Sequence, residues 1–232
     1  MSDDACEDAG RIGHRRRLKD RFLSSLRGGN IDSLHDYEYL ELLLFSAIPR
    51  RDVKPLAKKL LARFGSVGSV LSAPPDQLIP LVGPAGTIVL KTAMTAATWM
   101  LRERVLDQPI LGSWDALLDY CMATMGHLET EHFRILFLNQ KNRLIADEVM
   151  QRGTVDQAPV YPREIASRAL ELKASAIIMV HNHPSGDPKP SRADVTMTKQ
   201  VREALQPLCI TLHDHIIVSS SGCCSFKSEH VL

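Results

Sequence analysis

Two histidines and one aspartate stand at a spacing suited to a metal site. His181 and His183 end an apolar run, and a turn rich in proline and glycine separates them from Asp194. Side chains alternate along a strand, so both imidazoles project from one face, and the turn brings the start of the next helix back beside the strand end. Two imidazoles and a carboxylate with an open fourth position form the ligand set of a catalytic zinc. His181, His183 and Asp194 are therefore predicted to bind one zinc ion.

The same residues also allow a purely structural interpretation. Ser191 begins the helix that carries Asp194, and this pair fits a helix N-cap with an acidic residue three positions later. In that alternative the two histidines are structural residues at a strand end. The agreement of ligand type with spacing favours the metal site. Asp187, inside the turn, is expected to form the turn rather than bind the ion.

The order of these residues resembles the JAMM (MPN+) metalloprotease motif. That motif is an upstream Glu, then His-x-His, seven residues, Ser, two residues and Asp, as at 181–194 here. The longer string HNHPSGDPKPS is similar to the RadC branch of bacterial proteins, as are Arg152-Gly153-Thr154 and Tyr161-Pro162-Arg163-Glu164 before it. The resemblance extends from about Leu18 to about Phe226. It implies a JAMM/MPN zinc domain that hydrolyses an amide bond, in relatives commonly an isopeptide bond to a ubiquitin-like tag.

Two acids compete for the role of the upstream Glu. On a strand, Glu148 shares the more apolar face with Ala146 and Met150, and Asp147 lies on the other face. A carboxylate on an apolar face needs a partner, and a metal-bound water would supply one. The resemblance also points to Glu148. The alternative is an edge-strand Glu148 that faces solvent.

The resemblance implies a role for each of these residues. Zinc lowers the pKa of its bound water toward about 7 and polarises the scissile carbonyl. Glu148 would accept the proton and pass it to the leaving group. The Ser191 hydroxyl would help to stabilise the oxyanion, and helix capping is an equally open role for it. We therefore predict a zinc-dependent metallopeptidase that acts on a peptide or protein substrate.

A second His-x-His pattern occurs at His213 and His215. No carboxylate follows it at helical-turn spacing, so these histidines are predicted to be structural residues of a strand. By the resemblance, Asp214 and His215 would lie near the site and support its ligands.

Hydrophobic periodicity predicts the elements that carry this site. The fully apolar run at 176–180 indicates a central strand, and 139–142 is typical of a hairpin turn. The order of strands and helices predicts an α/β (α+β) domain with a mixed sheet flanked by helices. Predicted helices cover 114–125, 163–173 and 192–206, and predicted strands cover 133–138, 143–150, 176–180 and 210–218.

The N-terminal part has helical spacing up to residue 104. Breakers such as Gly28-Gly29-Asn30 and Pro74-Pro75 divide it into four or five helices. We predict a disordered acidic tail at 1–10, an all-α, helix-hairpin-helix-like domain at 11–105, a linker at 106–112 and the JAMM/MPN zinc domain at 113–232.

The segment Gly83-Pro84-Ala85-Gly86 carries an alternative function. It resembles a helix-hairpin-helix turn, which offers backbone amides at a helix N-terminus to a DNA phosphate, although Pro84 removes one donor. In this alternative the chain is a DNA-associated repair or recombination module that contacts DNA through residues 80–92. Its metal domain would be non-catalytic or nuclease-like.

Composition excludes few classes of protein. The 232 residues are 44% hydrophobic and 24% charged, and the net charge of +1 makes no case for nucleic-acid binding by the whole molecule. No apolar run of about 18 residues predicts a membrane span, and the N-terminus lacks an apolar signal core, so a cytoplasmic protein is expected. The five cysteines are odd in number and form no CxxC pattern. They are expected to be buried or incidental thiols.

Overall fold

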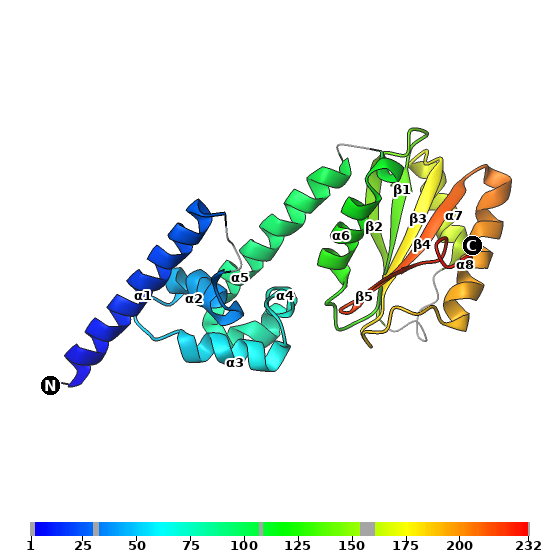
Figure 1. Ribbon diagram of the computed structural model, residues 1–232. Coiled ribbons are helices and arrows are strands. Elements are labelled where there is room, and N and C mark those ends of the chain that lie inside the picture. Colours follow the sequence, from blue (N-terminus) through cyan, green and yellow to red (C-terminus); the bar gives the residue numbers. More distant parts are fainter. Residues whose placement is uncertain (1–2, 30–32, 107–108, 154–160, 232) are drawn as a thin grey trace. The chain divides into compact units, whose positions relative to one another are not determined.

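The computed structural model describes residues 3–29, 33–106, 109–153 and 161–231 (Figure 1). The chain forms two compact units, Met1–Ala96 and Ala97–Leu232. Their boundary falls inside a helix and not at the predicted linker 106–112. That helix continues to Leu106, and Ile110–Gly112 forms a short 3-10 turn. Residues 107–108 of the predicted linker and Thr154 of the RadC-like string lie outside the described residues.

Helices are the regular secondary structure of the first unit in the part of it that the structure describes. Its core gathers leucines from every part of the unit, among them Leu40, Leu60 and Leu78, which are fully buried. The backbone is helical from Asp3, within the segment 1–10 for which a disordered tail was predicted. The helices are α1 (Asp3–Arg27), α2 (Asp36–Ala47), α3 (Lys54–Phe64), α4 (Val67–Ser72) and α5 (Pro75–Leu106).

Helix α5 is long, apolar and kinked. Gly83 takes a non-helical backbone conformation (φ 71°, ψ 173°) between two helical stretches, and Pro84 begins the second of them. By length and composition alone, α5 could cross a membrane, which departs from the expectation that no segment would. Its exposed apolar side chains include Ile88, Trp99 and Met100.

The second unit contains a five-stranded mixed sheet in the order β2-β1-β3-β4-β5. Strands β1 and β2 form the predicted antiparallel hairpin, and β3 is central, antiparallel to β1 and parallel to β4. The short β5 was not predicted from the sequence. The strands are β1 (His132–Leu138), β2 (Leu144–Arg152), β3 (Ala176–Asn182), β4 (Thr211–Ser219) and β5 (Gly222–Ser225).

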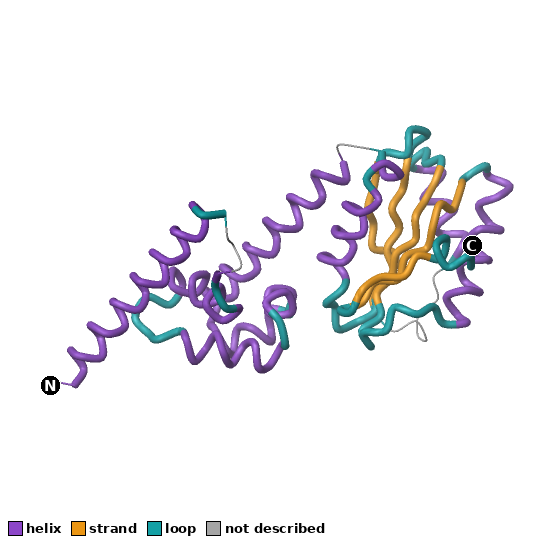
Figure 2. Tube along the Cα trace, in the orientation of Figure 1, coloured by secondary structure: helices purple, strands orange, loops and turns teal. Residues whose placement is uncertain are grey.

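Helices cover both faces of this sheet, as Figure 2 shows. Helix α6 (Trp114–Met125) packs on one face, where Leu117 meets Leu136 and Ile178 in the core. Helices α7 (Pro162–Glu171) and α8 (Arg192–Leu205) pack on the other face, which carries Phe133 and Phe137. The predicted mixed sheet flanked by helices is therefore confirmed. Strand β3 is buried along its whole length, as its fully apolar run suggested.

Candidate metal centre

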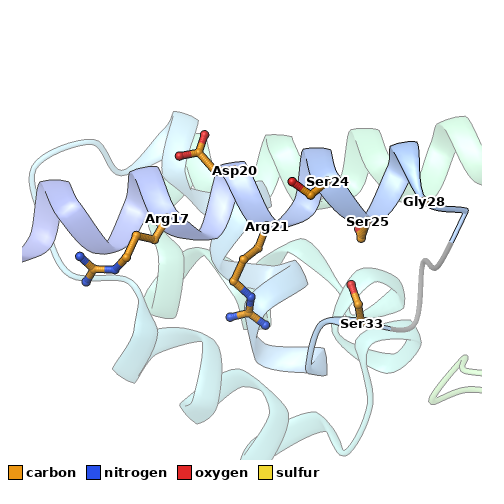
Figure 3. Close-up of a pocket in the computed structure, with 7 residues that line it drawn as sticks. All are labelled: Arg17, Asp20, Arg21, Ser24, Ser25, Gly28 and Ser33. Atoms are coloured by element: carbon orange, nitrogen blue, oxygen red, sulfur yellow. The ribbon is translucent and has the colours of Figure 1, made fainter.

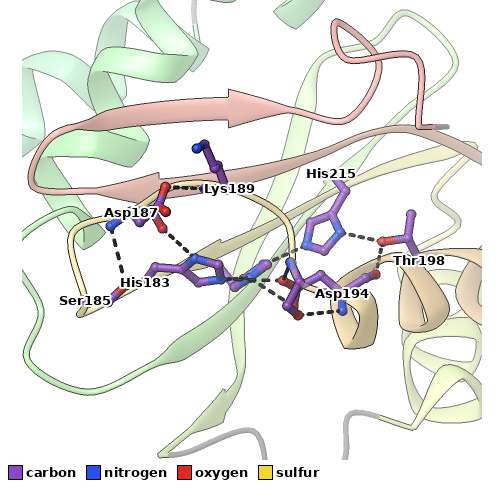
Figure 4. Close-up of polar contacts among 9 residues, drawn as sticks. His183, Ser185, Asp187, Lys189, Asp194, Thr198 and His215 are labelled. Atoms are coloured by element: carbon purple, nitrogen blue, oxygen red, sulfur yellow. Dashed lines mark hydrogen bonds and ion pairs between the residues drawn. The ribbon is translucent and has the colours of Figure 1, made fainter.

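The two histidines at the end of β3 meet a carboxylate from the first turn of α8, and Figure 4 shows His183 beside Asp194. The Nε2 atoms of His181 and His183 are 3.0 Å apart. The Asp194 oxygens lie 3.3 Å from His181 Nε2 and 3.5 Å from His183 Nε2. His181 and Asp194 are buried, with 1% and 3% of their surfaces exposed, and His183 is half-buried. The structure thus brings the three predicted ligands to one point.

The turn between β3 and α8 orients the second histidine. His183 Nδ1 lies 2.8 Å from the backbone oxygen of Asp187. A carbonyl oxygen only accepts hydrogen bonds, so Nδ1 carries the proton and Nε2 keeps its lone pair toward the site. The Asp187 carboxylate accepts a hydrogen bond from the Lys189 backbone N–H, which stabilises the turn. Asp187 therefore acts as a turn former, as expected.

A reciprocal cap at the start of α8 holds the carboxylate. The Ser191 hydroxyl accepts from the Asp194 backbone N–H at 3.2 Å, and the Asp194 carboxylate accepts from the Ser191 N–H at 2.7 Å. The capping role of Ser191 is therefore present. The same geometry leaves the Asp194 carboxylate beside both histidines, so capping and convergence occur together.

The electrostatics of this cluster favour a cation at its centre. Burial alone would raise the pKa of Asp194, but the hydrogen bonds that the protonated His181 and His183 rings donate, with one from the Ser191 N–H, outweigh it and hold that pKa well below its ordinary range. The hydrogen bond to Asp194 raises the pKa of His183. Two ring nitrogens 3.0 Å apart beside an ionised carboxylate need a shared positive charge, either a proton or a metal ion. The donor set of two imidazoles and one carboxylate fits a zinc ion.

A fourth residue, Glu131, lies beside the two histidines. One ligand atom each from Glu131, His181 and His183 falls within 4.8 Å of the others. Strand β1 runs antiparallel to β3 and pairs Phe133 with His181, so the residues just before β1 lie beside the end of β3. Glu131 was not among the predicted site residues, because only the pairing of β1 with β3 brings it to the histidines. No local sequence pattern signals that pairing.

Asn182, between the two histidines, holds the segment that carries Glu131. Its side chain, which is 1% exposed, accepts from the His132 backbone N–H at 2.8 Å. It also donates to the backbone oxygens of Leu128 and Thr130 at 3.3 and 3.0 Å. These three hydrogen bonds tie the approach to β1 against the end of β3. Each residue of the His-Asn-His sequence thus has a separate structural task.

The structure does not bring Glu148 to the histidines, which corrects its predicted position. Glu148 lies on β2, and β1 separates β2 from β3. Two strands with one strand between them are about 10 Å apart, twice the spacing of adjacent strands. Both Glu148 carboxylate oxygens accept from the Arg168 guanidinium, at 2.8 and 2.6 Å, and that hydrogen bonding lowers the pKa of Glu148. A partner was expected for this carboxylate, but it is an arginine of α7.

The competing acid, Asp147, lies on the opposite face of the sheet from these histidines. Its carboxylate accepts from the Tyr120 hydroxyl and from Arg134, the latter at 3.0 Å. Burial, with a further contribution from Asp147, raises the pKa of Tyr120. Asp147 is therefore part of the packing between α6 and the sheet.

The second His-x-His pattern divides between two places. His213 lies 2.7 Å from the Asn142 side chain in the β1–β2 turn. The His215 ring is buried and lies 2.8 Å from His181. Asp214 accepts from the Ser225 hydroxyl and from the backbone N–H of Lys227. The resemblance thus led correctly to His215 beside the site, whereas Asp214, predicted there with it, contacts Ser225 and Lys227 instead.

In the helical unit, the region proposed for DNA contact has little free positive charge. Lys91 is the one basic residue in 80–92, and its ammonium donates to the backbone oxygens of Leu71, Ser72 and Ala73 at 2.9–3.2 Å. Lys91 therefore caps the end of α4. A separate open pocket, shown in Figure 3, is lined in part by Arg17 and Arg21. Arg21 is paired with Glu38 at 2.9 Å.

Comparisons with known proteins agree with this geometry. Residues 111–231 match the family described as the RadC-like JAB domain. A UPF0758 protein of Rhodobacter capsulatus is 54% identical over 217 residues, which cover 93% of this chain and 100% of that protein. A UPF0758 protein of Ruegeria pomeroyi is 52% identical over 221 residues, which cover 94% and 97% of the two chains. The chain therefore belongs to the RadC-like JAB domain family.

Proposed function

We propose that this protein is a zinc-dependent metallopeptidase of the JAMM type, which cleaves an amide or isopeptide bond in a peptide or protein substrate. The observation that carries the proposal is the convergence of His181, His183 and Asp194 within 3.0–3.5 Å of one another, with Glu131 beside them. A buried carboxylate and two oriented imidazoles are costly to assemble without a cation to bind. This cost supports a functional metal site.

In the proposed site, His181, His183 and Asp194 hold the zinc ion. When bound, zinc supplies a Lewis acid for the scissile carbonyl and makes a water molecule acidic near neutral pH. The chain provides three ligands, which leaves room for water and substrate. The reciprocal cap between Ser191 and Asp194 holds the carboxylate in place during the reaction.

Glu131 takes the role of the general base, in place of Glu148. Its carboxylate accepts the proton of the attacking water and then delivers it to the leaving amine. Asn182 contributes by holding the 128–132 segment. Glu148 is unsuited to this role because the Arg168 guanidinium occupies both of its oxygens. The Ser191 hydroxyl can stabilise the oxyanion while its oxygen accepts from the helix.

The DNA-associated alternative has weaker support. Phosphate contacts need free cationic side chains or amides. In residues 80–92 the single lysine is engaged with backbone carbonyls of α4. We therefore place the hydrolase first.

A matched pair of glutamate variants tests the proposal. The zinc-loaded wild type, Glu131→Gln and Glu148→Gln are assayed on fluorogenic peptide amides and on a lysine isopeptide substrate. We expect Glu131→Gln to retain its zinc and to lose at least about 100-fold in rate, because general base catalysis contributes about 10²–10⁴. We expect Glu148→Gln to match the wild type.

Two outcomes would contradict the proposal. Equal rates for Glu131→Gln and wild type would remove Glu131 from the mechanism. A zinc-loaded wild type that cleaves neither substrate class would contradict the peptidase assignment itself.

A further inference from the structure

A buried series of hydrogen bonds leads from α8 to the first histidine of the metal centre, and Figure 4 labels its first two members, Thr198 and His215. The Thr198 hydroxyl lies 2.6 Å from His215 Nδ1, and His215 Nε2 lies 2.8 Å from His181 Nδ1. The three residues are at most 3% exposed. Water therefore has little access to these contacts, and the groups themselves determine where the protons lie.

Thr198 determines which atoms donate and which accept along this series of hydrogen bonds. Its hydroxyl donates to the backbone oxygen of Asp194 at 2.6 Å. That carbonyl oxygen can only accept, so the single hydroxyl proton is used there. Toward His215 the Thr198 oxygen can then only accept. His215 Nδ1 must carry a proton and donate it.

The next contact follows from the neutrality of His215. Its ring is fully buried and lies against Phe133 and Phe226, with centroids 5.9 and 4.5 Å away. A positive charge in this apolar setting, away from water, is costly, so the ring is neutral. A neutral ring with a proton on Nδ1 has none on Nε2. His215 Nε2 therefore accepts from His181 Nδ1.

We propose that Thr198 is a positioning residue that sets the tautomer of His181 through His215. His181 Nδ1 carries its proton because His215 can only accept, so His181 Nε2 turns a bare lone pair toward Asp194 and His183. The position of the ring proton is fixed in a different way in each of the two histidine ligands. A backbone oxygen, that of Asp187, orients His183 directly, and a side-chain relay two contacts long orients His181. This inference builds on the zinc ligands proposed above and adds no hydrolytic step.

The first measurement uses the metal-free wild-type protein. Long-range ¹H–¹⁵N correlation spectra distinguish protonated from bare ring nitrogens in each histidine. We expect His215 and His181 both to carry the proton on Nδ1 in the neutral state. A spectrum in which His181 carries its proton on Nε2 would overturn the proposal. The measurement needs neither zinc nor substrate, so it is independent of whether the protein is a peptidase.

The second measurement changes the start of the relay. In Thr198→Val, the His215 Nδ1–H group loses its acceptor, and moving the proton to Nε2 replaces a buried unpaired N–H donor with an unpaired ring acceptor, which is less costly. That proton would be donated to His181 Nδ1 and would force the His181 proton onto Nε2, where it blocks the metal. We expect a concerted tautomer change at both histidines and a loss of zinc affinity of about 10–100-fold, as for other supporting partners of metal ligands.

Two further variants separate this role from a general effect on α8. Thr198→Ser keeps the hydroxyl and is expected to keep the wild-type tautomers and zinc affinity. Thr196→Val removes the same kind of side-chain bond, from Thr196 Oγ1 to the Arg192 carbonyl oxygen at 2.9 Å, on the exposed face of the same helix. It is expected to bind zinc like the wild type. Unchanged tautomers and zinc affinity in Thr198→Val, or an equal loss in Thr196→Val, would overturn the proposal.

Discussion

Strands β3 and β4 are parallel neighbours; a His-x-His pattern spans the end of β3, at 181–183, and another lies within β4, at 213–215. On β3 the two rings converge, with their Nε2 atoms 3.0 Å apart. On β4 one ring reaches the β1–β2 turn and the other supports His181. The same pattern of residue types thus produces two converging rings at the end of one strand and two unrelated contacts on the next.

The two pairs of histidines behave differently because β3 is regular and β4 contains a bulge. The register of β4 against β3 shifts by one residue, because Ile177 pairs with Leu212 and Ile178 pairs with Asp214. His213 is the additional residue in this bulge, so the simple alternation of faces fails there. His183 instead lies just beyond a regular strand, and its backbone N–H still donates to the Val218 oxygen. A spacing of two residues is therefore informative only where the strand is regular.

The largest expected effect is the difference in zinc affinity between two variants, each of which truncates one histidine of one pattern. His181→Ala removes one of three proposed ligands and should reduce zinc affinity by more than the roughly 100-fold typical of supporting residues. His213→Ala should bind zinc like the wild type. Metal content of the purified proteins measures both. Equal zinc loss in the two variants would show that the strands do not differ in this way.

The middle residue of each pattern gives the next largest effect. Asn182→Ala removes three hydrogen bonds to partly buried backbone groups of the 128–132 segment and should lower the free energy of unfolding by about 3 kcal/mol. It should also reduce hydrolysis, because the Glu131 segment loses its anchor. Asp214→Ala should destabilise the fold comparably, since Asp214 holds residues 225–227, but should spare the Glu131-dependent rate.

Urea unfolding of the metal-free proteins, together with the peptide assay, measures this second pair. Full hydrolytic activity in a folded Asn182→Ala protein would separate Asn182 from Glu131 and contradict the positioning role.

His183, just after β3, and His215, on β4, should also respond differently to pH. The Asp194 hydrogen bond raises the pKa of His183 above its ordinary value near 6.5. In the metal-free protein this pair should stabilise the fold fully below the unfolded-state pKa, and this stabilisation should be lost as pH rises through the raised pKa. Zinc competes with that proton, so zinc affinity should fall as pH falls from about 8 to about 6.

His215 on β4 has a lowered pKa and should stay neutral over that range. Histidine NMR titrations and zinc titrations at several pH values measure both. Asp194→Asn should remove the upward shift at His183, and a shift that persists in this variant would contradict its assigned cause.

The smallest effect concerns the stability contribution of His213. Its single described hydrogen bond joins β4 to Asn142 in the β1–β2 turn. His213→Ala should therefore cost about 1 kcal/mol or less in the free energy of unfolding. A loss of several kcal/mol would mean that the bulge itself depends on this ring.

The elements of the second unit were largely predictable from periodicity. The helix at 114–125 agrees with α6, and the ends of the four predicted strands differ from those observed by at most two residues. Long apolar or amphipathic segments carry a strong local signal. β5 (Gly222–Ser225) carries little, because it is short and made of Gly, Cys and Ser. It forms a strand through its pairing with β4.

The limits of the site prediction have a topological cause. His181, His183 and Asp194 are close in sequence, so a strand, a turn and a helix sufficed to bring them together. Glu131 reaches the site only because β1 lies between β2 and β3, and no local pattern encodes that strand order. Alternation along β2 correctly predicted that Glu148 needs a partner. It could not distinguish a metal-bound water from the Arg168 guanidinium.

The most direct test of the central claim is to locate the metal itself. Crystals of the zinc-loaded protein, measured on both sides of the zinc absorption edge, give an anomalous difference map. We expect a single strong peak in contact with His181 Nε2, His183 Nε2 and an Asp194 carboxylate oxygen. A peak elsewhere, or none at these three side chains in fully loaded protein, would contradict the assignment of the metal centre.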